Sequence, residues 1–241
     1  MTARNHTLTV TEHLEELRRR LAISLGAVVV ATCLSFWLSG RLVSWLKRPA
    51  GDLLPTLAFF SPTEAIVAYM KVAVVFGVVL SMPVMLYQVW AFVRSGLLEG
   101  ERRYGLAFIL GGSALFLCGG WLAYAVLLPA FLRFLLTFGG PDVRPVISIS
   151  PYLSFVLGMM IATGLLCELP LVIMVLVRIG VLTPQSLRRR RGLAIVIIMV
   201  VAAFVTPTTD AMSLLMLAVP LLLLYELSIL LSGLVAKRPS S

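Results

Sequence analysis

Long runs without a charged residue constrain this chain more than any other feature of its sequence. Four such runs are at least 20 residues long: Leu21 to Gly40, Val72 to Val93, Tyr104 to Leu132 and Pro145 to Cys167. At a rise of about 1.5 Å per residue, each can cross the roughly 30 Å hydrocarbon layer of a membrane as a helix. With 60% hydrophobic and 13% charged residues, the sequence predicts an all-α, polytopic membrane protein.

Two shorter uncharged runs, Gly192 to Thr209 and Ala211 to Tyr225, follow near the C-terminus. The first offers only 14 residues before Thr206-Pro207, or roughly 21 Å of helix, which is short for a bilayer. The pair therefore forms either a re-entrant hairpin or two spans in a locally thinned membrane. The spans are predicted within a single membrane domain, residues 1–241, at about 21–40, 68–93, 104–136, 151–179, 192–206 and 211–232.

The distribution of basic residues predicts how these spans are oriented. Of the 20 lysines and arginines, 14 fall in the N-terminal segment, the segments around Arg102 and Arg188, and the tail. Because cytoplasmic loops carry an excess of Lys and Arg, both termini are predicted to be cytoplasmic. Residues 1–20 then form a cytoplasmic amphipathic helix and residues 233–241 a cytoplasmic tail. The net charge of +9 reflects this uneven distribution of basic residues. The lipid bilayer is therefore an expected partner of the chain, and nucleic acid is not.

Acidic residues stand among arginines in two of the segments predicted to be cytoplasmic. In the first segment, Glu16 precedes Arg20 by four residues, an acid-first spacing that stabilises a helix slightly. In the second segment, Glu101 is followed by Arg102 and Arg103. On these residues alone, a membrane-surface helix with solvated charges is the favoured interpretation of the first segment. The recurrence of the pattern on the same side raises the alternative of an acidic binding site.

Two further acids lie in or beside the predicted spans. Glu168 stands near the middle of the fourth, where an ionised carboxylate costs about 3 kcal/mol. For this residue a functional role is favoured over a structural one. It is either a proton-relay carboxylate or a polar contact for a passing ligand. Asp210 follows the Thr206-Pro207 break. Capping of the final helix is its default role, and proton coupling is the alternative.

The sequence carries no pattern for enzymatic chemistry. The two histidines, His6 and His13, belong to no HExxH motif, and the sequence contains neither a glycine-rich phosphate loop nor a GxSxG nucleophile elbow. The cysteines Cys33, Cys118 and Cys167 are tens of residues apart inside apolar runs, which indicates packing rather than a metal or disulfide site. The chain is therefore expected not to be an enzyme and to need no metal or cofactor.

Seven short blocks, in order along almost the whole chain, resemble the TatC family, the multispanning core of the twin-arginine protein translocase. The blocks are HLEELRRRL (13–21), FSPTEA (60–65), PVMLYQVWAF (83–92), ERR (101–103), YLSFV (152–156), ELP (168–170) and TPTTD (206–210). The resemblance implies six transmembrane helices in a cupped arrangement, with the last two short. It also implies a location in the cytoplasmic (inner) membrane of a prokaryote.

The resemblance further implies a receptor for signal peptides that carry two adjacent arginines. Such a receptor works with TatA-type and TatB-type single-span subunits, in an oligomeric complex, to export folded cargo using the proton motive force. In the family, the acid of the N-terminal motif and the acid of the first cytoplasmic loop bind the arginine pair; here these are Glu16 and Glu101. Arg18, Phe92 and Arg103 are expected to shape that site.

For Glu168, the resemblance implies a polar residue inside the concave face of the family fold. The residues themselves leave two other functions open. One is a proton-coupled small-solute transporter that uses Glu168. The other is a purely structural scaffold.

Overall fold

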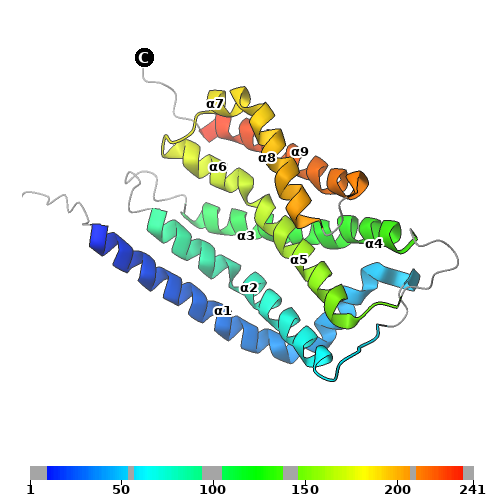
Figure 1. The fold of residues 1–241 in the computed structure, drawn as a ribbon. Helices are drawn as coiled ribbons and strands as arrows, with labels where there is room; N and C mark the ends of the chain where they lie inside the picture. Colours follow the sequence, from blue (N-terminus) through cyan, green and yellow to red (C-terminus); the bar gives the residue numbers. More distant parts are fainter. Residues whose placement is uncertain (1–9, 54–56, 94–104, 138–145, 207–209, 236–241) are drawn as a thin grey trace, which may run out of the picture.

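The structure, a computed structural model, describes residues 10–53, 57–93, 105–137, 146–206 and 210–235. Over these residues the chain is mostly helical, with short connecting turns and one bridge between Ala58 and Ser148. In chain order the elements are α1 Val10–Lys47, η1 Arg48–Leu53, α2 Glu64–Val93, α3 Gly105–Leu122, η4 Ala123–Leu127, α4 Leu128–Thr137, α5 Ile149–Cys167, α6 Leu169–Arg178, α7 Pro184–Arg189, α8 Arg191–Val205 and α9 Ala211–Val235 (Figure 1).

The lengths of the helices follow the uncharged runs of the sequence. Five helical stretches in the described part of the chain are long and apolar enough to cross a membrane: Leu14–Gly51, Glu64–Val93, Gly105–Thr137, Ile149–Arg178 and Ala211–Gly233. The remaining apolar helix, α8, has 15 residues, or about 22 Å. The shortness predicted for the fifth segment is therefore confirmed. Contrary to the expectation, the last helix is not short: α9 has 25 residues, because it continues past Glu226, which forms an ion pair with Arg191.

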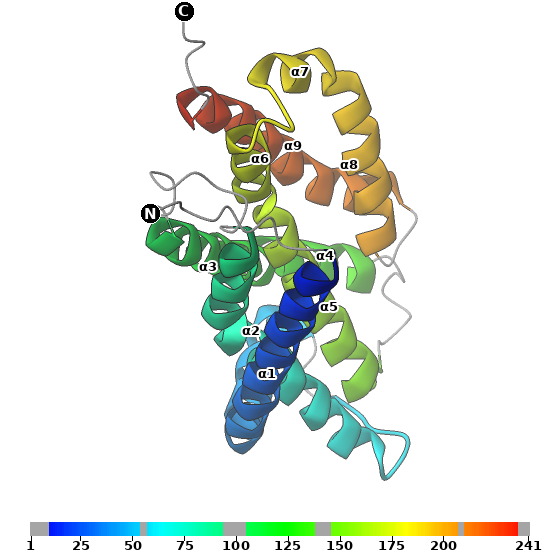
Figure 2. The same ribbon diagram turned by 90° about the vertical axis from the view of Figure 1, so that its left-hand side faces the viewer.

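Helices α1 and α2 form an antiparallel pair that lies along one side of the molecule (Figures 1 and 2). Their backbones come close where Gly77 of α2 faces Thr32 of α1. A Cβ atom on Gly77 would lie only 2.8 Å from the Cα of Thr32. Glycine at this position is therefore what permits the close approach of the two helices.

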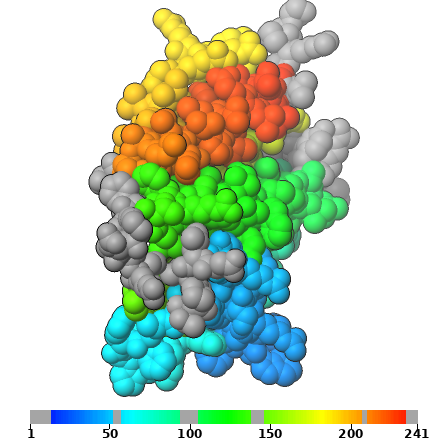
Figure 3. Space-filling model, turned by 90° about the vertical axis from the view of Figure 1, so that its right-hand side faces the viewer, coloured from blue at the N-terminus to red at the C-terminus, as the bar shows by residue number. Residues whose placement is uncertain are grey.

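Helices α3 and α5 cross in a second close contact at the centre of the molecule. A Cβ on Gly119 of α3 would lie 2.6 Å from Sγ of Cys167 and 2.8 Å from the carbonyl oxygen of Thr163. Gly164 of α5 faces Phe116 of α3 in the same way. The central layer of α3 and α4 lies between the α1–α2 pair and the α8–α9 pair (Figure 3). The core is built where these layers meet, from side chains that include Leu46, Leu128, Phe131, Leu153, Leu217 and Leu221.

A polar network closes the end of the bundle where α1 meets η1 and where α2 and α5 begin, here called the cap end. Glu64, in the first turn of α2, accepts hydrogen bonds from the Phe60 N–H at 2.9 Å and the Ser150 N–H at 3.2 Å, and from the Ser148 hydroxyl. The Lys71 ammonium donates to the hydroxyls of Ser150 and Ser154 at 3.0 and 2.9 Å. These bonds fasten the start of α2 to the start of α5.

Replacing Glu64 with alanine should loosen the cap end. The substitution removes the acceptor for three donors, and each hydrogen bond to a charged group contributes about 1.5–3 kcal/mol. Because this network is partly exposed, we expect the free energy of unfolding to fall by about 2–3 kcal/mol in total. Thermal unfolding in lipid nanodiscs measures the change. Glu64→Gln keeps an acceptor oxygen at the same reach and should lose less than half as much; equal losses would show that these hydrogen bonds do not stabilise the fold.

Candidate functional site

Glu16, the first of the acids predicted to bind the signal peptide, lies near the start of α1. Its carboxylate forms an ion pair with Arg20 one turn later, and Arg20 Nε donates to Glu16 Oε1 at 3.2 Å. The predicted Glu16–Arg20 pair is therefore confirmed. The Glu16 side chain is still 28% exposed, and the neighbouring Arg18 is exposed. The carboxylate is thus compensated by an arginine of its own chain while remaining accessible to another.

The packing of α1 on α2 brings Glu16 to the level of the end of α2. The two antiparallel helices are in register where Thr32 meets Gly77. Glu16 precedes Thr32 by 16 residues, and Val93 follows Gly77 by 16 residues, which is about 24 Å along each helix axis. Phe92, another residue predicted to shape the site, is half-buried at this same level. Glu16 and Phe92 therefore belong to one end of the bundle, here called the loop end.

The start of α3 is held at the loop end by aromatic packing. Gly105, the first residue of α3, lies directly against the indole of Trp90, and a Cβ at Gly105 would be 2.9 Å from Trp90 Cδ1. The Trp90 ring also packs on Phe108 of α3, with ring centroids 5.0 Å apart. Both helix ends that flank residues 94–104 therefore lie at the loop end. Glu101 and Arg103 belong to this segment and lie outside the described residues.

Glu168 lies where the fourth predicted span is interrupted, between α5 and α6. Pro170, in the first turn of α6, cannot donate the backbone hydrogen bond that would continue the helix. The Glu168 side chain is buried, and a Cβ on Gly112 of α3 would lie 3.2 Å from its Oε2. Leu86 and Leu171 line the same contact. Neither carboxylate oxygen has a hydrogen-bond partner among the residues that the structure describes.

Replacing Glu168 with methionine should therefore leave the fold intact or stabilise it. A buried polar group without a partner costs about 1–3 kcal/mol, and a methionine of similar length removes that cost. We expect the free energy of unfolding of Glu168→Met, measured by thermal unfolding in nanodiscs, to match or exceed that of the unchanged chain. Glu168→Gln, which keeps a polar group there, should gain less. A clear loss of stability in the methionine variant would show that the carboxyl group supports the fold.

Asp210 lies at the start of α9 and caps that helix. The backbone N–H of Ser213 donates to Asp210 Oδ2 at 2.7 Å, and the N–H of Leu214 donates to the Asp210 carbonyl oxygen at 3.2 Å. The predicted capping role is therefore confirmed. Proton coupling by this residue stays a prediction.

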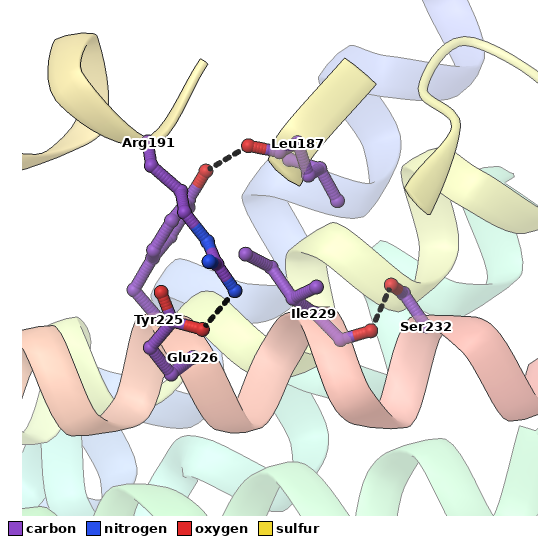
Figure 4. Close-up of polar contacts among 6 residues, drawn as sticks. All are labelled: Leu187, Arg191, Tyr225, Glu226, Ile229 and Ser232. Carbon is purple, nitrogen blue, oxygen red and sulfur yellow. Dashed lines mark hydrogen bonds and ion pairs between the residues drawn. The ribbon is translucent and has the colours of Figure 1, made fainter. Parts of the chain in front are cut away.

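Polar contacts also hold the corner between α7 and α8 against α9 (Figure 4). Arg191 forms an ion pair with Glu226 at 2.7 Å, and the Tyr225 hydroxyl donates to the Leu187 carbonyl oxygen at 3.0 Å. Glu226 therefore has a structural role in holding α8 to α9. The partner of Glu226 and the contact between Trp90 and Gly105 were not evident in the sequence, because each joins residues on different helices.

The described residues offer no obvious metal site. Among them, no group of three or more His, Cys, Asp or Glu side chains is placed to hold an ion. At the loop end, the exposed carboxylate of Glu16 is instead suited to binding a cationic group.

A family model described as Sec-independent protein translocase protein (TatC) matches residues 12–220 of the chain. The chain belongs to the TatC family. Among similar proteins, the TatC of Carboxydothermus hydrogenoformans is 35% identical over 97% of this chain and 96% of its own length. The TatC of Aquifex aeolicus is 37% identical over 96% of this chain and 97% of its own length. Membership of a protein-translocase family confirms that the chain is a transport component and not an enzyme.

Solved TatC structures agree with the fold described above. A crystal structure of a protein described as twin arginine translocase receptor TatC superimposes with a TM-score of 0.82, at 37% identity over 94% of this chain and all of that one. A second crystal structure of such a receptor, in DDM, gives 0.83 at 38% identity over 92% of this chain and 99% of that one. The predicted all-α, polytopic TatC fold is thus confirmed, and the chain is a multi-pass membrane protein.

Proposed function

We propose that this TatC-family chain is the receptor for twin-arginine signal peptides and the core component of a translocase that exports folded proteins. The observation that carries the proposal is the accessible Glu16 carboxylate at the loop end, level with the helix ends that flank residues 94–104. We propose that Glu101, from the segment between these helix ends, supplies the second acid of the site.

The chemistry of the site favours arginine over lysine. A guanidinium group offers a planar fork of donors that pairs bidentately with a carboxylate, whereas an ammonium is a point charge. Arg20 already pairs with Glu16, with Nε and Nη2 both donating to Oε1, so an incoming arginine replaces one guanidinium with another. Each exposed pair contributes about 1 kcal/mol at most. Two acids and an apolar groove for the rest of the signal peptide are therefore needed together.

The remaining parts of the site are assigned on the same basis. We place Arg18, Phe92 and Arg103 around the arginine pair, because Arg18 is exposed beside Glu16 and Phe92 lies at the same level. Glu168 is proposed as a polar residue on the concave face of the fold. Because its side chain is buried beside Gly112, we give it a role separate from arginine recognition.

The location and the partners follow from the proposed function. We infer a multi-pass protein of a prokaryotic cytoplasmic (inner) membrane, with both termini and the loop end in the cytoplasm, where signal peptides are made. The excess of basic residues in those segments supports this orientation. TatA-type and TatB-type single-span subunits are the proposed partners in an oligomeric complex driven by the proton motive force. The alternative of a proton-coupled small-solute transporter is not favoured by the family match.

Signal-peptide binding to the full chain in lipid nanodiscs tests this function. Two peptides that differ only in carrying an arginine pair or a lysine pair are compared by equilibrium titration. We expect the arginine peptide to bind about tenfold more tightly, since loss of the bidentate geometry costs about 1.4 kcal/mol. Equal affinities would contradict a receptor for twin-arginine peptides.

A further inference from the structure

A cavity of about 140 Å³ lies between α1, α2, α3 and α5, near the middle of the α2, α3 and α5 spans. Its lining is apolar and includes Trp45, Phe76, Phe116, Gly120, Trp121 and Met160. It is separate from the loop end, because Val79, on its α2 wall, is 14 residues before Val93. That separation amounts to about 21 Å of helix.

The cavity opens toward the surroundings of the helices. Leu117 and Trp121 form part of its wall, and their side chains are 54% and 60% exposed. An apolar cavity of about 150 Å³ is known to stay dry and to hold a hydrocarbon the size of benzene. For a protein embedded in a bilayer, the hydrocarbon available at such an opening is an acyl chain. The lining therefore selects a lipid chain rather than water.

Aromatic side chains frame the cavity on the cap-end side. The rings of Trp45 and Tyr124 stack with centroids 3.9 Å apart, and the Tyr124 hydroxyl donates to the Trp45 carbonyl oxygen at 2.9 Å. Trp121 packs on Tyr124 with centroids 5.7 Å apart. The lining residues of α2, α3 and α5 lie near the middle of their spans. An acyl chain that fills the cavity therefore extends past these rings from the headgroup layer at the cap end.

A cation stands on the headgroup side of this aromatic frame. Arg48 follows Trp45 by three residues, so it lies about one helical turn closer to the cap end on the same face. It is exposed, and it is near enough to Tyr124 to interact with the phenol electrostatically. We propose that the cavity holds one acyl chain of a phospholipid whose phosphate pairs with Arg48. The acyl chain then fills the space between the side chains of α1, α2, α3 and α5 and contacts all four helices.

Photocrosslinking of the full chain in nanodiscs tests the acyl-chain site. The probe is a phosphatidylcholine with a diazirine on one acyl chain, and labelled residues are identified by mass spectrometry. We expect Met160, on the α5 wall of the cavity, to be labelled about tenfold more than Leu153, which is fully buried on the same helix. Equal labelling of the two residues would overturn the proposal and leave a partner helix as the occupant.

Filling the cavity provides a matched pair of variants. A Cβ on Gly120 meets only the Met160 carbonyl oxygen, at 3.8 Å, so Gly120→Leu can place its side chain in the cavity. Gly111, on the same helix, has nothing within 4 Å of its Cβ position and lies outside the cavity lining. We expect labelling of Met160 to fall about tenfold in Gly120→Leu and to stay unchanged in Gly111→Leu. Unchanged labelling in Gly120→Leu, with normal thermal unfolding, would contradict a chain bound there.

The headgroup contact is tested with a diacylglycerol that carries the same photoreactive chain but no phosphate. Because the phosphate forms an exposed ion pair with Arg48, we expect the phospholipid to label Met160 about fivefold more than the diacylglycerol does. Arg48→Gln should abolish that preference, whereas replacement of Arg41, an exposed arginine near the end of α1, with glutamine should keep it. Equal labelling by the two lipids in the unchanged chain would overturn the role of Arg48. None of these readouts depends on signal-peptide binding, so they can fail or succeed independently of the proposed receptor function.

Discussion

Capture of a twin-arginine signal peptide should fall by about 25-fold when Glu16 and Glu101 are both replaced with alanine, because two charge-assisted pairs of about 1 kcal/mol each are lost. Each single replacement should cost about fivefold. The binding titration in nanodiscs measures the affinity, and export of a folded reporter in cells measures the consequence. Since the remaining groove still binds the apolar part of the signal peptide, export should be lost before all binding is lost.

The chain offers a matched control for this pair of substitutions. Glu15 and Glu99 stand in the same two segments as Glu16 and Glu101, and Glu15 is exposed. Replacing both with alanine removes the same net charge from the loop end. We expect affinity for the signal peptide to change by less than twofold in this control. A similar loss in both double variants would mean that the segments attract arginine through net charge alone, without a defined site.

Gly77→Ala should destabilise the fold. The added Cβ would lie 2.8 Å from the backbone N and Cα of Thr32, so the two helices must move apart. Overpacking of this kind costs about 1–3 kcal/mol, and for a chain of this size about 2–4 °C of melting temperature is lost per kcal/mol. Differential scanning fluorimetry in nanodiscs measures the shift. Because the register of α1 on α2 places Glu16 beside the end of α2, peptide affinity should fall as well.

Two further variants separate the steric effect from a general effect of alanine in a helix. Gly26 of α1 has nothing within 4 Å of its Cβ position, and alanine there should leave the melting temperature unchanged or raise it. Thr32→Ala in the Gly77→Ala background removes the clash with the threonine hydroxyl but not the clash with the backbone. It should therefore restore only part of the loss. Full stability of Gly77→Ala alone would show that the helices are not packed as closely as the structure has them.

The sequence predicted the helices well because their limits are set by local chemistry. Uncharged runs of sufficient length predict spans wherever they occur, and the short α8 is limited by Arg191 at one end and by the Thr206-Pro207 break at the other. Capping by Asp210 could be predicted because the acceptor and its donor are three residues apart. The Glu16–Arg20 pair, one helical turn apart, was predictable for the same reason.

Contacts between distant segments could not be predicted in this way. Glu64 and Ser148 are 84 residues apart, and nothing in either local pattern indicates that they meet. The packing of Gly105 on Trp90 and the cavity beside Trp45 likewise depend on how whole helices are placed. For Glu168, the sequence predicted an intramembrane acid, but its burial against Gly112 required the fold.

The central claim is that the arginine pair of a signal peptide is held at the loop end. A photocrosslinker placed beside that pair in a bound peptide, followed by mapping of the labelled positions on the full chain, tests the claim most directly. We predict labels on the turn that contains Glu16 and Arg18, at Phe92, and within residues 94–104. Labels concentrated at the cap end, around Lys71 and Ser150, would contradict it.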